Sequence, residues 1–284
     1  MFHVPWKRCG RPGVAHGVLG VVLLLGLAGC GIGHIRTLRE AEEAFSRAAE
    51  VENRERLNPT APLASLGESA SGYRVAAQMV NDLVAKEREQ LRRDNLLCTA
   101  YLVQAMSLWR LGEHDAAYEV ATQGRDCAPP GPTTDTTPRD RAVLHAIPAL
   151  VRIDQANALA VNQTVSEAEF DKAKTEIDRA VRILEEAERL ASKDHPVRGY
   201  LMISKLAALR VWQVAITRET LVDPKRREQL VAFNQQATKA WLDYRHFVTC
   251  QLDRPGDPSV EYWRKLFQLA APETQVVCDQ PPVR

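Results

Sequence analysis

Apolar side chains recur at intervals of three and four residues through almost every long segment of this sequence, and no long segment alternates apolar with polar residues. The first spacing places apolar side chains on one face of an α-helix, whereas a half-buried β-strand needs strict alternation. The clearest case is the segment 166–190, whose apolar stripe consists of Ala173, Ile177, Ala180, Leu184 and Ala187. The pattern therefore predicts an all-α fold.

Capping and breaking residues divide the chain into about eight to ten helices. Ser166 followed by Glu169 forms a capping box, which predicts the start of one helix. A linker rich in Pro, Ser, Ala and Gly spans 57–72, and a loop rich in Pro, Thr and Gly spans 127–138. The predicted helices are 35–56, 73–93, 98–111, 113–124, 138–161, 166–190, 197–222, 224–250 and 258–269.

Two of the predicted helices have an unusual composition. Pro148 lies inside the helix at 138–161, and an interior proline predicts a bend because it removes a helical hydrogen bond. The helix at 197–222 is apolar around much of its circumference. Such a helix is expected at the centre of a fold, with neighbours on several sides.

The segment 97–130 has the spacing of a helical hairpin, since one helix stops at Gly112 and the next ends before Pro129 and Pro130. Its characteristic positions are Ala105, Leu108, Gly112, Ala117 and Pro129. This pattern resembles the tetratricopeptide repeat, in which antiparallel helix pairs stack and bury a continuous core. Ala121 and Gly124 depart from it, because that family prefers a large apolar residue and an alanine there.

Two further segments imitate the second helix of such a repeat, and neither follows a convincing first helix. They carry Ala41, Phe45 and Ala48, and Ala173, Ile177 and Ala180. The resemblance implies a tetratricopeptide-like array of stacked antiparallel helix pairs with a concave face suited to binding. We expect an N-terminal helical region at 30–130 and a C-terminal helical region at 131–284 that packs on it.

The first 29 residues have the three zones of a secretory signal peptide. Lys7, Arg8 and Arg11 give a positive start, residues 18–27 are apolar apart from Gly20 and Gly26, and residues 27–30 read Leu-Ala-Gly-Cys. A positive start, a short apolar run and small residues before a cleavage site mark export. The run is shorter than the roughly 20 apolar residues that a membrane-spanning helix needs.

Residues 27–30 resemble the lipobox of bacterial lipoproteins. The resemblance implies that Cys30 is acylated, becomes the first residue of the mature chain and holds it on a membrane leaflet. Gly31 stands where an aspartate would favour inner-membrane retention in that family, which implies the outer membrane and a periplasmic orientation. An uncleaved anchor and an ordinary signal peptide are alternatives, and both also export the chain.

Export places the remaining cysteines in an oxidising compartment, where disulfides form and persist. Cys98 opens the first helix of the hairpin and Cys127 follows its second helix. Antiparallel helices bring those two ends within bridging distance. We therefore predict the disulfides Cys98–Cys127 and Cys250–Cys278, the second of which depends on a turn at 253–258.

The charged residues argue against a nucleic-acid partner, and they form no recognisable metal-binding or catalytic motif. The 37 Lys and Arg nearly balance the 36 Asp and Glu, whereas a nucleic-acid-binding surface is basic. Asp243 and His246 lie one turn apart, but nothing nearby completes a metal site. Neither a hydrolase nucleophile elbow nor a glycine-rich phosphate loop occurs. We expect no nucleic acid, no metal, no cofactor and no catalytic activity.

A group of aromatic residues in the C-terminal region is the candidate ligand wall: Trp212, Phe233, Trp241, Tyr244, Phe247, Tyr262 and Trp263. Packing between helices is the simpler interpretation, and one side of an apolar pocket is the functional one. The predicted function is a lipid-anchored, non-catalytic periplasmic binding or scaffold component of an envelope assembly or transport system. The alternative is a carrier of an apolar small molecule, such as a lipid or sterol, between membranes.

Overall fold

The computed structural model describes residues 32–57, 66–127, 136–161, 166–191, 195–222 and 226–251. These residues form eight α-helices and no β-strand, which confirms the all-α prediction. The helices are α2 (Gly33–Leu57), α3 (Leu66–Arg93), α4 (Leu97–Arg110), α5 (His114–Gln123), α6 (Thr136–Val161), α7 (Glu167–Leu190), α8 (Pro196–Val222) and α9 (Arg227–His246). A 3₁₀ turn, η2 (Gly124–Asp126), follows α5, and a π-helical turn, η4 (Phe247–Gln251), follows α9.

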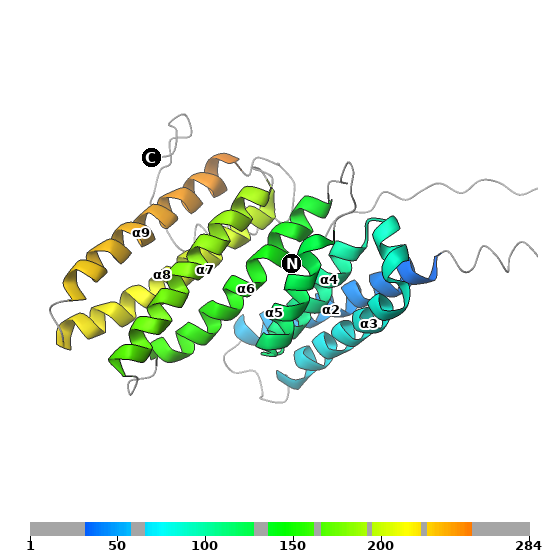
Figure 1. Cartoon of the computed structure of the whole chain (residues 1–284), viewed down its shortest axis with the longest axis horizontal. Helices are drawn as coiled ribbons and strands as arrows, with labels where there is room; N and C mark the ends of the chain where they lie inside the picture. Colours follow the sequence, from blue (N-terminus) through cyan, green and yellow to red (C-terminus); the bar gives the residue numbers. More distant parts are fainter. Residues whose placement is uncertain are drawn as a thin grey trace, which may run out of the picture.

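Consecutive helices pack as four antiparallel pairs, α2 with α3, α4 with α5, α6 with α7 and α8 with α9 (Figure 1). The first helix of each pair contacts the first helix of the next pair, and each second helix packs against the following first helix. Successive second helices make little or no direct contact. This is the contact pattern of a stacked helical-repeat array. We call α2, α4, α6 and α8 the inner layer, and α3, α5, α7 and α9 the outer layer.

Helices within one layer run parallel, so the helix ends collect at two edges of the array. Thr99, near the start of α4, donates a hydrogen bond to the buried Asp140 near the start of α6. His34, near the start of α2, lies 2.6 Å from Asp94, directly after α3. The starts of the inner helices and the ends of the outer helices therefore lie at the same edge.

Two apolar clusters fill the space between the layers, and α6 contributes to both. Leu144 and Ile147 belong to the cluster formed with α2 to α5, whereas Val143 and Leu150 belong to the cluster formed with α7 to α9. The helix α8 contacts α6, α7 and α9, as its apolar circumference predicts. The predicted boundary between the N-terminal and C-terminal regions lies outside the described residues.

The first helix pair corrects two sequence-based expectations. The helix α3 begins at Leu66, so residues 66–72 are helical where a linker was expected. A Cβ on Gly72 would lie only 2.8 Å from the Cβ of Ala48, so this glycine permits the close approach of α3 to α2. The helix α2, whose Ala41 and Phe45 imitate a second repeat helix, is the first helix of its pair.

The other helix starts and turns are closer to expectation. Ser166 and Glu169 form the predicted capping box of α7. Gly112, in the turn between α4 and α5, has φ 76°, in the left-handed region that favours glycine. The helix α6 is the first helix of the pair that α7 completes, a partner that the sequence pattern of α7 did not reveal. It continues through Pro148. A bend at Pro148 stays a prediction.

Candidate binding groove between α7 and α9

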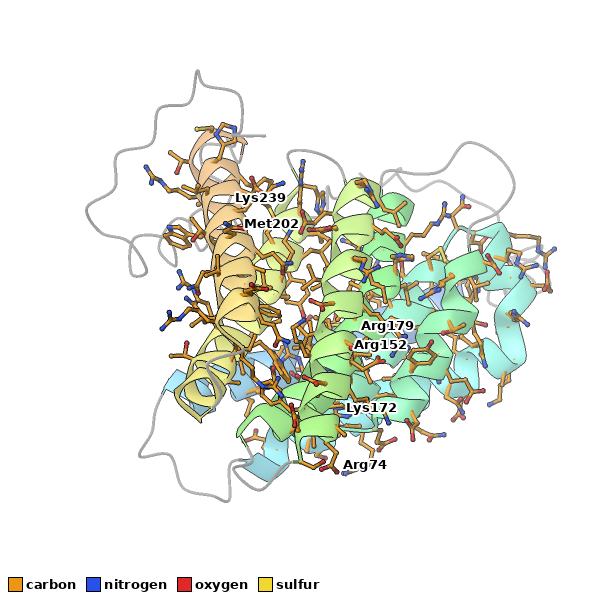
Figure 2. All side chains as sticks on the ribbon, turned by 60° about the vertical axis from the view of Figure 1, so that its left-hand side comes forward. Arg74, Arg152, Lys172, Arg179, Met202 and Lys239 are labelled. Atoms are coloured by element: carbon orange, nitrogen blue, oxygen red, sulfur yellow. A yellow bond between two sulfur atoms is a disulfide. The ribbon has the colours of Figure 1, made fainter. Side chains whose placement is uncertain are left out.

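The outer helices α7 and α9 lie on either side of α8 and leave a groove whose floor is α8. We call it the α7/α9 groove, and its volume is about 670 Å³. Its lining residues are Lys174, Asp178, Val181, Arg182 and Glu185 of α7, Lys205 and Leu209 of α8, and Glu228, Gln229, Ala232, Phe233, Gln236, Lys239, Ala240 and Asp243 of α9. Figure 2 shows Lys239 on α9.

Helical register explains why these side chains reach the groove. The buried stripe of α7 faces its packing partners and contains Phe170, Ala173, Ile177, Ala180, Leu184, Ala187 and Glu188. Lys174 and Asp178 each follow a member of this stripe by one position, so they lie along its border. Gln236 and Lys239 each precede a member of the buried stripe of α9 by one position, so they lie along the border of that stripe. The groove therefore has polar borders and a partly apolar strip between them.

A buried cation forms part of the floor. Lys205 is only 5% exposed, and it lies on α8, a helix that is apolar around much of its circumference. Its Nζ lies 2.9 Å from a carboxylate oxygen of Glu188 and 3.8 Å from one of Glu185, both on α7. Burial raises the pKa of Glu188, and the positive charge of Lys205 partly opposes that rise. The ion pairs fix α7 to α8 directly beneath the groove.

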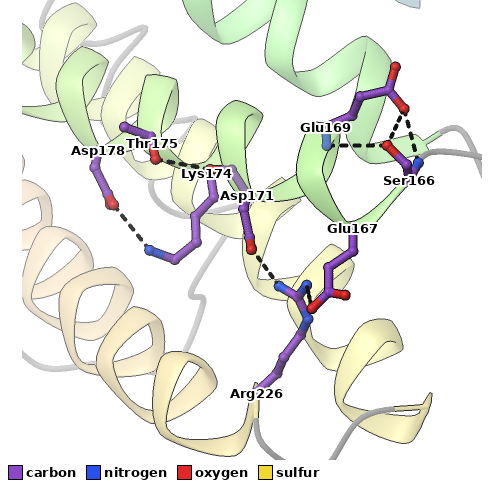
Figure 3. Close-up of polar contacts among 8 residues, drawn as sticks. All are labelled: Ser166, Glu167, Glu169, Asp171, Lys174, Thr175, Asp178 and Arg226. Carbon is purple, nitrogen blue, oxygen red and sulfur yellow. Dashed lines mark hydrogen bonds and ion pairs between the residues drawn. The ribbon is translucent and has the colours of Figure 1, made fainter.

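Arg226, directly before α9, joins the start of that helix to the start of α7 (Figure 3). Its guanidinium donates to Asp171 at 2.8 Å and to Glu167 at 3.4 Å, and it lies 4.9 Å from the ring centroid of Phe170. At the same helix start, hydrogen bonds from Ser166 lower the pKa of Glu169. These contacts hold the starts of α7 and α9 together.

The rim of the groove carries charges of both signs. Lys174 pairs with Asp178 at 3.1 Å, and its Nζ lies 5.3 Å from the ring centroid of Phe233. Four other lining charges form no ion pair within the described part of the chain: Arg182, Glu228, Lys239 and Asp243. An occupant with charges of both signs could therefore pair with the rim.

Two other places in the array, each between neighbouring outer helices, correspond to the α7/α9 groove. One of them is open and the other is filled by a side chain. A groove of about 570 Å³ lies between α3 and α5 over α4, where Gln104 donates to Asn81 at 3.2 Å. Between α5 and α7, Arg152 of α6 fills the corresponding position. It lies between the Tyr118 ring, 5.8 Å from its centroid, and the Glu176 carboxylate, with which it pairs.

Most of the predicted aromatic wall is in the core. Trp212, Phe233, Tyr244 and Phe247 are each at most 2% exposed and belong to the C-terminal apolar cluster. Trp241 is partly buried and packs against the same cluster, 6.3 Å from the Tyr244 ring. Phe233 is the member of this described group that lines the groove. Tyr262 and Trp263 lie outside the described residues.

The cysteines agree with the predicted pairing as far as they are described. Cys98 and Cys127 form a disulfide that joins the start of α4 to the end of η2. Cys250 also takes part in a disulfide. Cys30 and Cys278 lie outside the described residues, so acylation of Cys30 and the Cys250–Cys278 pairing stay predictions.

The sequence analysis did not identify the charged residues in and beside the groove. The position of Lys205 within an apolar helix could have indicated one of them. A lysine in the middle of an apolar helix needs a partner, and Glu185 and Glu188 stand one helix earlier. The position of Arg226 left no comparable signal, because Asp171 is 55 residues away in the sequence. Contacts at that separation depend on the stacking of the pairs.

Neither a metal centre nor a membrane-spanning helix is found in the described ranges. No group of three or more His, Cys, Asp or Glu side chains gathers there in a way that could hold a metal ion. None of the described helices is both long and apolar enough to cross a membrane. Comparison with known proteins gives no match, since no family model, curated protein or solved structure is significantly similar to this chain.

Proposed function

We propose that this chain is a lipid-anchored, non-catalytic binding or scaffold component of a cell-envelope assembly or transport system. In this proposal the α7/α9 groove binds a segment of a protein partner. The observation that supports it is the groove itself, which is bordered by polar side chains of α7 and α9 over a floor that includes Leu209 and Lys205.

The chemistry of the groove fits an amphipathic helix. Such a segment places an apolar stripe into a groove between helices and pairs its flanking charges with the rim. Val181, Leu209 and Phe233 would meet the apolar stripe, and Arg182 and Lys239 would meet acidic side chains of the partner. Because both signs occur on the rim, the partner segment should also carry basic residues.

The carrier function has less support. A pocket for an apolar small molecule encloses most of its ligand with apolar and aromatic side chains. The α7/α9 groove is open on one side and has eight charged residues among its lining residues, while Trp212, Tyr244 and Phe247 pack in the core. These features favour a protein segment as the occupant.

Neighbouring glutamines on α9 provide a matched test. Gln236 lines the groove, whereas Gln235 is exposed on the same helix and does not line it. A photo-crosslinking amino acid at position 236, introduced in the native host, should give one discrete crosslinked complex. The same amino acid at position 235 should give much less of it. Western blotting and mass spectrometry measure both. Equal crosslinking from the two positions would assign the contact to the general surface of α9 and contradict the proposal.

Anchoring belongs to the same proposal and has its own test. Replacing Cys30 with serine removes the thiol that would be acylated, so the protein should leave the membrane fraction or accumulate unprocessed. Membrane fractionation and the mass of the mature N-terminus measure this. A Cys30→Ser protein that fractionates with the outer membrane as the parent does would show that the chain is held there by something else.

A further inference from the structure

The three places between neighbouring outer helices differ in the side chain that the inner helix beneath them supplies. Between α5 and α7, the inner helix α6 supplies Arg152, which pairs with Glu176 of α7. Between α7 and α9, the inner helix α8 supplies Lys205, which pairs with Glu188 of α7. Between α3 and α5, the inner helix α4 supplies Gln104, a neutral amide, and none of its residues that line this place is a cation.

We call the place between α3 and α5 the α3/α5 groove, and its volume is about 570 Å³. Tyr101 and Leu108 of α4 lie on its floor, while Val84 of α3 and Val120 of α5 lie on its two walls. Leu108, Val84 and Val120 are partly exposed. A long side chain with a polar end could bury its aliphatic stem against these residues.

The polar side chains of the groove leave hydrogen-bond acceptors unused. Gln104 is only 8% exposed, and its amide nitrogen donates to Asn81 at 3.2 Å. Among the described residues, none donates to the carbonyl oxygen of Gln104. Gln78 and Gln123 also use their amide nitrogens within the protein, in hydrogen bonds of 2.9 and 3.2 Å to carboxylates of their own helices. The carbonyl oxygens of three glutamines are therefore available to a donor.

Two carboxylates at the start and in the middle of α5 also line the groove. Glu113 and Glu119 are exposed, and neither forms an ion pair within the described part of the chain. Because α4 and α5 are antiparallel and the chain turns at Gly112, Glu119 lies level with Gln104. A buried amide oxygen and a carboxylate without a cation therefore occur at one level of the groove.

The arginines near the groove lie toward its two ends. Arg74 (Figure 2) is the first lining residue of α3, as Glu113 is of the opposite wall. Since α3 and α5 run parallel, Arg74 lies at the end marked by Glu113, whereas Glu119 is six residues, or about 9 Å, further along α5. Arg88 and Arg125 follow the last lining residues of the two walls and do not line the groove. The middle of the groove therefore has no arginine or lysine among its described lining residues.

We propose that the α3/α5 groove binds an arginine side chain from a segment of a protein partner. The aliphatic stem would lie on the apolar floor, and the guanidinium would donate to the carbonyl oxygen of Gln104 and to the carboxylate of Glu119. A planar guanidinium with five donors suits two acceptors at one level better than the compact ammonium of lysine. Arg152 makes the same kind of contact from within the chain, where it lies between the Tyr118 ring and the Glu176 carboxylate.

This inference rests on the binding of a protein partner proposed above, and it adds a second contact of stated chemistry. Two exposed apolar positions of α3 test where the contact lies. Ala85 lines the groove, whereas Val75 is 49% exposed and does not line it. A photo-crosslinking amino acid at position 85, introduced in the native host, should give a discrete complex, and the same amino acid at position 75 should give much less. Mass spectrometry should find an arginine within the crosslinked segment.

Three single variants test the chemistry at the same crosslinking position. Gln104→Arg supplies from α4 the cation that α6 and α8 supply at the other two places, so it should fill the groove and suppress the complex. Glu119→Gln removes an exposed carboxylate without disturbing the core, and it should also suppress the complex. Asp115→Asn removes an exposed carboxylate of α5 that does not line the groove, so it should crosslink like the parent.

Calorimetry with the captured segment measures the contribution of the arginine directly. The segment is synthesised with arginine or with citrulline, its neutral isostere, and titrated into the mature protein. Citrulline should raise Kd at least tenfold, equivalent to about 1.4 kcal/mol. The Glu119→Gln protein should bind the arginine segment about as weakly as the parent binds the citrulline segment. The Asp115→Asn protein should keep the parent's preference for arginine.

The possible failures of the two proposals are distinguishable. Equal affinity for the arginine and citrulline segments, or a complex at position 236 with none at position 85, would overturn the arginine site alone. A complex at position 85 with none at position 236 would support the arginine site and contradict binding in the α7/α9 groove. No complex at either position would overturn the proposed function and the arginine site with it.

Discussion

Replacing Lys205 with methionine should lower the free energy of unfolding by about 3–5 kcal/mol, the range expected when one partner of a buried ion pair is removed. Lys205 is 5% exposed and pairs with Glu188, which is 9% exposed. Methionine keeps much of the side-chain volume but leaves the Glu188 carboxylate buried beside Glu185 without a cation. Urea unfolding of the mature domain at neutral pH measures the change.

The pH dependence of that deficit identifies its cause. Burial already raises the pKa of Glu188, and loss of the Lys205 charge should raise it further. A carboxyl whose pKa is higher in the folded state than in the unfolded chain is tolerated when protonated and destabilises the fold as the pH rises through that pKa. The deficit should therefore shrink at mildly acidic pH.

A second substitution provides the control. Lys205→Met/Glu188→Gln removes both charges of the pair and should recover most of the lost stability near neutral pH. An equal deficit in the single and double variants, at both pH values, would attribute the loss to packing around Lys205 instead of to the buried carboxylate.

Removing the hairpin disulfide should have an effect of similar size. The double variant Cys98→Ala/Cys127→Ala opens a bridge between cysteines separated by 29 residues. A loop of that length corresponds to about 3–4 kcal/mol in the chain-entropy model, because the bridge restricts the unfolded chain. The midpoint of urea unfolding should fall accordingly.

Reductant distinguishes this bridge from the one at Cys250. Under reducing conditions the parent should become at least as unstable as the oxidised double variant, since both bridges then open. The double variant should lose only the contribution of the Cys250 bridge. A double variant that unfolds at the same urea concentration as the parent would contradict the stabilising role assigned to Cys98–Cys127.

The elements that sequence predicted best are those whose signals are local. The capping box of Ser166 and Glu169 and the apolar stripe of α7 lie within one helix, and α7 ends at Leu190 as expected. The hairpin of α4 and α5 turns at Gly112, where a positive φ is needed. Cys98 and Cys127 follow from that hairpin, because antiparallel helices return the chain to its starting edge.

The elements that sequence missed depend on how distant helices stack. Gly72 suggests a linker when its neighbours alone are considered, yet it allows α3 to approach Ala48 of α2. The α7/α9 groove exists because two outer helices flank α8 without touching closely, and no periodicity within α7 or α9 encodes that spacing. As a sequence pattern, Phe233, Tyr244 and Phe247 fit core packing most simply but also a ligand wall, and their burial decides for the core.

Binding of a protein segment in the α7/α9 groove is tested most closely by direct titration. The segment identified by crosslinking at position 236 would be synthesised and titrated calorimetrically into the mature domain. The variant Arg182→Glu/Lys239→Glu reverses two rim charges, whereas Lys172→Glu/Arg227→Glu reverses two exposed charges of the same helices outside the groove. We predict that the rim variant raises Kd at least tenfold, equivalent to about 1.4 kcal/mol, while the control variant binds like the parent. Equal affinity of the parent and the rim variant would contradict binding in the groove.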